Sequence, residues 1–516
     1  MLKHSLLAAA VAAAFAAPMA SAAESKELKE IRAQIRQMKD SYEARLQALE
    51  QRLEKAQAAT ADAQAQTKAL AASVAAAPAA SNGAASAAAA NAGAGAPSLA
   101  ASGAARAAGD AGSAVTSASL AGPGSGMSTS VASAGSAAPA SNLFNPNISM
   151  ILGGTMQNLS QDPGQYRLQG FVPSGGEGGP GSRGFSLGES ELTMAANIDP
   201  QFAGQLTFAL GADNTVSVEE AFVRTRAMSN GLNLKAGRFL SALGYMNGQH
   251  AHTWDFVDAP LAYQAFLGGQ YKPDGVQGKW LAPLDQYLEI GVELGNGSAF
   301  PGTARNKNGN GATTVFAHLG DDIGDSASYR VGLSHLRTGA HERAFEDGGL
   351  NNAFSGKSRT WVADGIFKWA PNGNPTQTNF KLQGEYFRRH ESGQLAVDTS
   401  GENAASGSYA STQSGWYLQS VYQFKPNWRA GLRYDRLSSG SQRIGLVDDG
   451  TVSLASLPIL EAYTPSRSSV MFDYSPSEFS RLRLQLARDK SRPGVTDNQI
   501  FLQYIMSLGT HAAHAF

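Results

Sequence analysis

The residue types that can do chemistry gather between positions 243 and 271, where His250 and His252 stand two residues apart and Asp255 and Asp258 follow. Imidazole nitrogens and carboxylate oxygens are ligands that suit zinc and similar divalent ions. His250 and His252 are therefore candidates for a metal site. The alternative is that both imidazoles only take part in hydrogen bonds, in which case no cofactor is expected.

The same segment carries Trp254, Tyr263 and Phe266 beside these polar groups. Apolar side chains of this size are stabilised when they leave water. A long loop that contains them is therefore expected to fold against the rest of the protein. The elements on either side of the loop decide where it folds.

From Phe144 onward, apolar and polar residues alternate in short segments that are separated by clusters of Gly, Pro, Asn, Asp and Ser. A period of two places successive side chains on opposite faces of a β-strand. The clearest example is Arg481, Leu482, Arg483, Leu484, Gln485 and Leu486. The pattern predicts an all-β fold, a transmembrane antiparallel β-barrel of about 16 strands over residues 143–516.

The connections between the expected strands alternate between short and long. Short ones are expected at 198–200, 229–231, 282–285, 371–373, 426–427 and 475–477, and long ones at 161–183, 243–271, 295–312, 339–358, 391–414 and 437–466. Aromatic residues recur near strand ends, at Trp369, Phe424, Trp428, Tyr434, Tyr474 and Phe516. Tight periplasmic turns, long outer loops and aromatic girdles are typical of outer-membrane barrels. An even strand number places both ends of the barrel in the periplasm.

The N-terminal part of the chain predicts three further segments. Residues 1–22 resemble a secretory signal peptide that ends in Ala20-Ser21-Ala22, with a membrane anchor as the alternative. Residues 23–56 carry apolar residues at heptad-like spacing with one stutter, which predicts a periplasmic coiled coil or, alternatively, a single amphipathic helix. Residues 57–142 are rich in Ala, Ser and Gly and predict a linker.

Composition excludes several classes of function. The chain has no cysteine, so disulfides and thiol catalysis are excluded, and its net charge of -1 gives no support for nucleic-acid binding. The motifs H-E-x-x-H and the P-loop are absent, and no enzymatic activity is expected.

A barrel of about 16 strands leaves a water-filled lumen, and its inward residues then decide which solutes pass. Pore-lining charges are expected at Glu189, Glu191, Glu220, Glu289, Glu293, Lys381, Arg429, Arg433, Arg481 and Arg483. These charges either create a field across the pore or are solvated and neutralise each other. The loop at 243–271 is expected to fold inward and narrow the pore through His250, His252, Trp254, Asp255, Asp258, Tyr263 and Phe266.

Four segments carry a family resemblance, namely 183–191 (RGFSLGESE), 197–200 (NIDP), 235–239 (KAGRF) and 250–256 (HAHTWDF). With them the chain resembles the proteobacterial porin superfamily, and in it a porin-like family whose members are often labelled zinc-regulated outer-membrane receptors or relatives of phosphate-selective porins. The coiled coil before the barrel is similar to that of sugar porins. The receptor label fits poorly, because such receptors resemble a 22-stranded barrel with a folded plug.

Together these features predict an outer-membrane porin for passive diffusion of small hydrophilic solutes or ions. One alternative is a substrate-specific uptake channel or receptor for zinc, phosphate or an oligosaccharide. Another is a structural tether between the outer membrane and the cell wall. Expected partners are outer-membrane lipid, two further copies of the chain in a homotrimer, and the barrel-assembly machinery, which Phe516 addresses by resemblance to other outer-membrane barrels.

Overall fold

The computed structural model describes residues 146–509, without 175–178, 212, 227 and 305–306. The signal peptide, the coiled coil, the linker and Phe516 lie outside the described residues and stay predictions.

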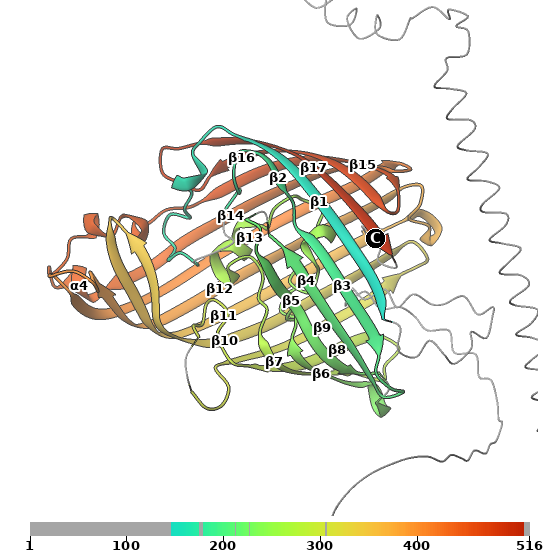
Figure 1. Ribbon diagram of the computed structural model, residues 1–516, viewed down its shortest axis with the longest axis horizontal. Coiled ribbons are helices and arrows are strands. Elements are labelled where there is room, and N and C mark those ends of the chain that lie inside the picture. The colour runs from blue at the N-terminus through green and yellow to red at the C-terminus, as the bar shows by residue number, and fades with distance from the viewer. Residues whose placement is uncertain (1–145, 175–178, 212, 227, 305–306, 510–516) are drawn as a thin grey trace, which may run out of the picture. The chain divides into compact units, whose positions relative to one another are not determined.

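The described residues form one antiparallel sheet that closes on itself, because β1 pairs with β17. Figure 1 shows the tilted strands wound into a barrel. The strands are β1 (Asn147–Leu159), β2 (Gly184–Leu187), β3 (Ser190–Asn197), β4 (Phe202–Leu210), β5 (Val216–Thr225), β6 (Leu232–Arg238), β7 (Asp274–Leu281), β8 (Tyr287–Gly295), β9 (Ala312–Ile323), β10 (Ala327–Asp347), β11 (Leu350–Trp369), β12 (Asn379–Val397), β13 (Ala405–Lys425), β14 (Trp428–Ile444), β15 (Ser466–Ser477), β16 (Ser480–Lys490) and β17 (Asp497–Gly509).

Two of these strands, β2 and β3, together occupy one strand position in the barrel wall. β2 pairs with Gly154–Gln157 of β1, and β3 pairs with Asn147–Ile151 of the same strand. When β2 and β3 are counted as one interrupted strand, the seventeen strands of the described sheet form a barrel of sixteen strands. The predicted fold class is therefore confirmed.

Alternation decides which side chains face out of the barrel. In β16, Leu482, Leu484 and Leu486 are 39–43% exposed, whereas Arg481, Arg483 and Gln485 are at most 1% exposed. The same contrast recurs around the wall, with an apolar outer surface and a polar interior. None of the described helices is long and apolar enough to cross a membrane.

Two of the six expected long connections are wrong, and a third begins later than expected. Residues 339–358 are mostly strand and turn at Gly348-Gly349, whose positive φ angles of 60° and 80° suit a tight hairpin. Residues 391–414 are strand except for 398–404. The connection expected at 437–466 is long, but it starts after Ile444 because β14 continues to that residue. The physical reason is a second apolar cluster at this end of the barrel, where inward residues of the extended strands pack against a covering loop at 457–460.

The helices of the described residues are short. They are α3 (Leu261–Leu267), α4 (Gly445–Asp448) and the 3-10 turns η2 (Pro163–Gln165), η3 (Ser229–Gly231), η4 (Ala251–Thr253), η5 (Pro371–Gly373), η6 (Leu454–Ser456) and η7 (Pro458–Leu460). All seven residues of α3 are buried. The helix follows Pro260 and ends where Gly268 takes a left-handed conformation at φ 70°, which glycine adopts at no steric cost.

Candidate functional site

The segment between β6 and β7, Phe239–Pro273, is called the inner loop because it lies inside the barrel. Its atoms bond to inward side chains of distant strands. Ser241 Oγ donates to Glu293 of β8 at 2.5 Å, the Met246 amide donates to Glu385 of β12 at 2.9 Å, and the Leu261 amide donates to Asp435 of β14 at 3.0 Å. The inner loop therefore crosses the lumen from wall to wall.

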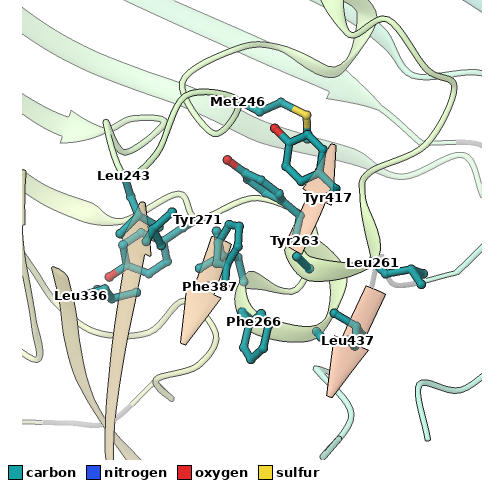
Figure 2. Close-up of a cluster of buried hydrophobic side chains, with 14 of the residues drawn as sticks. Leu243, Met246, Leu261, Tyr263, Phe266, Tyr271, Leu336, Phe387, Tyr417 and Leu437 are labelled. Atoms are coloured by element: carbon teal, nitrogen blue, oxygen red, sulfur yellow. The ribbon is translucent and has the colours of Figure 1, made fainter. Parts of the chain in front are cut away.

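Aromatic packing holds α3 of the inner loop against one side of the wall. The Phe266 ring stacks on Phe387 of β12 with centroids 5.7 Å apart, and Tyr263 meets Phe387 edge to face at 5.2 Å. Figure 2 shows Tyr263 and Phe266 turned toward Phe387 and Tyr417. The Tyr263 hydroxyl also donates to the Glu385 carboxylate at 3.0 Å. An expected constriction residue thus acts as both a packing and a hydrogen-bonding anchor.

One end of the inner loop is held by carboxylates. His250 lies 3.0 Å from Glu191, 3.1 Å from Glu219 and 3.1 Å from Glu220, and His252 lies 2.7 Å from Glu191. Burial alone would lower the pKa of His250, but these carboxylates raise it well above its ordinary value. This part of the inner loop is thereby tied to β3 and β5.

The middle of the inner loop is held by cations on the opposite strands. Asp255 lies 2.6 Å from Lys381 and 3.5 Å from Arg429, and Asp258 lies 2.7 Å from Arg433 and 2.6 Å from Arg467. Burial would raise the pKa of Asp258, but the two guanidinium groups and the bonds from Gln485 and Arg433 lower it to about 2. Asp258 is therefore a carboxylate at neutral pH.

The remaining expected loop residue, Trp254, is 8% exposed and belongs to the apolar cluster that also contains Tyr263 and Phe266. Its carbonyl accepts a hydrogen bond from Arg483 at 2.7 Å. The structure thus brings all seven expected loop residues into the barrel interior. Their part in solute passage stays a prediction.

The expected pore-lining charges face the interior on two sides of the wall. The expected carboxylates lie on strands between β3 and β8, at Glu191, Glu220, Glu289 and Glu293. The expected cations lie on β12, β14 and β16, at Lys381, Arg429, Arg433, Arg481 and Arg483. Glu189 lies between β2 and β3, and its carboxylate is within 4.8 Å of those of Glu191 and Glu219. Most of these groups are buried against the inner loop or paired with it.

Several interior charges were missed by the sequence analysis, among them Glu219, Glu385, Asp435 and Arg467. Glu219 has a specific cause. Thr207 pairs with Glu220 and Phe208 with Val218, so Glu219 is the extra residue of a β-bulge. A bulge breaks the period of two, and both Glu219 and Glu220 are buried.

A patch of half-buried polar side chains remains on the inward face near the short turns. Arg224 of β5, Asn233 and Lys235 of β6 and Lys279 of β7 are all of intermediate exposure, while their outward neighbours Leu232 and Leu234 are exposed. Arg224 pairs with Lys235 and Asn233 with Lys279 across adjacent strands. This patch is a polar, partly accessible part of the described interior.

The chain does contain one G-x-S-x-G spacing, at Gly184-Phe185-Ser186-Leu187-Gly188. A nucleophile elbow requires a sharp turn between a strand and a helix. Ser186 instead lies in the middle of β2, paired with Thr155 of β1. The geometry required for acyl transfer is therefore not formed at this serine.

Comparison with solved structures finds outer-membrane proteins at low identity. They include OmpT of Vibrio cholerae in its trimer form (10% identity, TM-score 0.44, 70% of this chain and 99% of that chain), OprB of Pseudomonas putida (12%, 0.44, 70% and 94%) and the outer membrane channel DcaP of Acinetobacter baumannii (12%, 0.42, 70% and 97%). With TM-scores below 0.5, the barrel assignment stands on the strand order and register of the chain itself.

No known protein-family profile matches the chain, so the receptor and phosphate-porin labels stay predictions. An uncharacterized protein of Aquifex aeolicus (strain VF5) is 30% identical over 355 residues, which cover 65% of this chain and 70% of the relative. At this identity and coverage, the chain belongs to the same protein family as the Aquifex aeolicus protein.

Proposed function

We propose that the protein is a narrow outer-membrane channel for passive diffusion of small hydrophilic solutes or ions, with the inner loop as its constriction. The observation that carries the proposal is the path of the inner loop, which spans the lumen between Glu191, Glu219 and Glu220 on one wall and the cations that hold Asp255 and Asp258 on the other. A solute that passes the barrel must pass this segment.

Inward charges of both signs support passage of ions and polar solutes over a purely structural role. The expected pore-lining carboxylates lie on β3 to β8 and the expected cations on β12, β14 and β16, although Lys279 on the first side and Glu385 on the second carry the opposite charge. Charged groups that line a pore filter ions and orient polar solutes. The half-buried patch around Lys235 and Lys279 supplies polar groups on the side of the short turns. A barrel used only as a tether has no need of these inward polar groups.

A substrate-specific uptake channel is the second candidate. It is favoured by loops that cover the barrel end formed by the extended strands, where Phe171 meets Phe266 and Leu457, Ile459 and Leu460 pack onto the wall. Coverage of this kind restricts the size of the entering solute. We place the short turns in the periplasm and the covered end outside the cell.

Single-channel recording in planar bilayers tests the proposal. The full-length purified protein is expected to give small ohmic steps, and Lys279→Gln is expected to shift the reversal potential in a salt gradient toward cation selectivity, because it removes an inward cation. The matched control is Arg359→Gln, whose side chain is exposed on β11.

Four outcomes separate the candidates. Steps that one solute blocks would favour the substrate-specific channel. Complete absence of steps would overturn both channels and favour the tether. A K279Q reversal potential equal to that of the wild type, or a shift of the same size in R359Q, would contradict an ion path along this patch.

A further inference from the structure

Two histidines and three carboxylates meet where the inner loop touches β3 and β5. His250 Nδ1 lies 3.0 Å from Glu191 Oε2 and 3.1 Å from Glu219 Oε2, and His252 Nδ1 lies 2.7 Å from Glu191 Oε1. Ligand atoms of Glu191, His250 and His252 all lie within 4.8 Å of one another. Three segments that are distant in the sequence thus direct imidazole nitrogens and carboxylate oxygens at one point.

One carboxylate oxygen in this cluster is buried without a hydrogen-bond donor. Glu191 and Glu219 are each 1% exposed. Among the described residues, Glu219 Oε1 accepts no hydrogen bond, and Lys272 Nζ lies 3.6 Å from it. Burial of a carboxylate oxygen without a bonded partner is costly unless a cation or a donor compensates it. Lys272 compensates the charge of this oxygen in part, and Glu219 Oε1 keeps an acceptor position that a further cation or donor can use.

We propose that Glu191, Glu219, His250 and His252 bind one divalent transition-metal ion of the zinc type. Two imidazoles and two carboxylates form a ligand set that suits zinc, whereas calcium and magnesium prefer oxygen ligands alone. The site lies inside the barrel and does not depend on whether the barrel conducts.

The geometry requires only small adjustments. Bonds of 2.0–2.2 Å in a tetrahedron separate ligand atoms by about 3.3–3.6 Å. Three of the six separations among the four ligands, at 2.7, 3.0 and 3.1 Å, are therefore close to those of a formed site, and the ligand atoms of Glu191, His250 and His252 all lie within 4.8 Å of one another. On binding, the ion replaces the protons that His250 Nδ1 and His252 Nδ1 share with the carboxylates, and both protons pass to solvent.

Glu220 completes the site as a positioning residue. Its carboxylate lies 3.1 Å from His250 Nε2, the ring nitrogen that faces away from Glu191. A metal-bound histidine usually donates its other N–H to a carboxylate, which fixes the tautomer and ring orientation. The metal would then join the inner loop to β3 and β5 through bonds stronger than the present hydrogen bonds.

The test is equilibrium dialysis of the full-length, detergent-purified and chelator-treated protein against Zn²⁺ alone. One ion per protomer is expected, and His252→Gln and Glu191→Gln are each expected to weaken binding at least tenfold. His318→Gln is the matched control, because His318 is another buried interior histidine and lies 3.3 Å from Glu289 outside the cluster. Heat-modifiable migration on gels verifies that each variant is folded.

Cobalt provides a second readout, since Co²⁺ in a four-coordinate site absorbs in the visible range. The wild type and H318Q are expected to show these bands, and H252Q is expected to lose them. Undetectable Zn²⁺ binding, equal binding by folded H252Q and E191Q, or displacement of Zn²⁺ by millimolar Ca²⁺ would each overturn the site. Equal binding by the variants would place the ion at other histidines, such as His511 and His514.

Discussion

At the residue scale, Asp258 ties the inner loop to cations on two neighbouring strands, β14 and β15. It binds Arg433 and Arg467 and accepts a bond from Gln485 at 2.9 Å. Asp258→Asn leaves two buried guanidinium groups short of a counter-charge, which costs about 3 kcal/mol for a buried pair. We expect the inner loop to detach in part, the free energy of unfolding to fall by about this amount, and the single-channel conductance to rise.

The matched control for this change is Asp285→Asn, an exposed aspartate in the turn between β7 and β8. It removes the same charge without touching the inner loop, so guanidinium titration and conductance should both match the wild type. Equal conductance in D258N and the wild type would show that the Asp258 pairs do not hold the constriction.

The same carboxylate predicts acid sensitivity. Its folded pKa of about 2 lies below the ordinary value of about 3.9, so its contribution to stability is complete above pH 4 and is lost as the pH falls toward 2. We expect the wild type to lose about 1.5–2 kcal/mol more than D258N between pH 5 and pH 2.5. Guanidinium titrations at pH 5, 4, 3 and 2.5 measure the difference. Parallel losses in the two proteins would assign the acid sensitivity to other carboxylates.

The inward direction of some side chains could be predicted from the sequence, and that of others could not. Arg481 and Arg483 could be assigned inward from alternation alone, because β16 pairs with β17 in unbroken register over this stretch. Glu219 could not, since a β-bulge depends on the register with β4, which one sequence does not specify. The proposed metal ligands span three elements, and only His250 and His252 are close enough in sequence to suggest a pair.

At the scale of elements, α3 is held to the wall by aromatic contacts. Phe266 stacks on Phe387, meets Phe171 edge to face at 5.7 Å, and lies 5.1 Å from the Arg389 guanidinium. Phe266→Ala is expected to lower the free energy of unfolding by about 3–5 kcal/mol, because it leaves a cavity in a packed cluster. Urea or guanidinium titration in detergent measures the loss.

Phe185 offers the comparison for α3, because it is 89% exposed on the outside of β2. Phe185→Ala removes the same side chain without a cavity in the interior, and a loss below about 1 kcal/mol is expected. Similar losses in the two variants would mean that α3 contributes little to the stability of the barrel.

Strands in which apolar and polar residues alternate strongly could be predicted from the sequence, but the residues at which these strands end could not. Residues 339–358 contain glycine, serine and charged residues typical of a loop, yet they continue β10 and β11 because Phe345 and Phe354 find apolar partners inside the barrel. Most of those partners come from residues 395–460, which lie far away in the sequence. The helix α3 was missed for a similar reason, since its seven buried residues show no amphipathic period.

At the scale of the whole molecule, the strand lengths around the barrel are unequal. β3 to β8 have 7–10 residues, whereas β10 to β14 have 17–21. The extended strands carry a second apolar cluster beneath the covering loops. The side of the wall formed by β3 to β8 lacks such an extension, and we propose that this side faces the neighbouring copies in a homotrimer.

The coiled coil predicted for residues 24–56 tests this assembly independently of the barrel. Its apolar stripe is too narrow to be buried by one helix alone, so neighbouring helices are expected to cover it and to hold the trimer together. Deletion of residues 24–56 should therefore lower the mass measured by light scattering under native conditions. A control deletion of equal length within the linker, residues 84–116, should leave the mass unchanged apart from the residues removed. A full-mass trimer in both deletion variants would assign the assembly to the barrel wall, and a monomeric wild type would contradict the trimer itself.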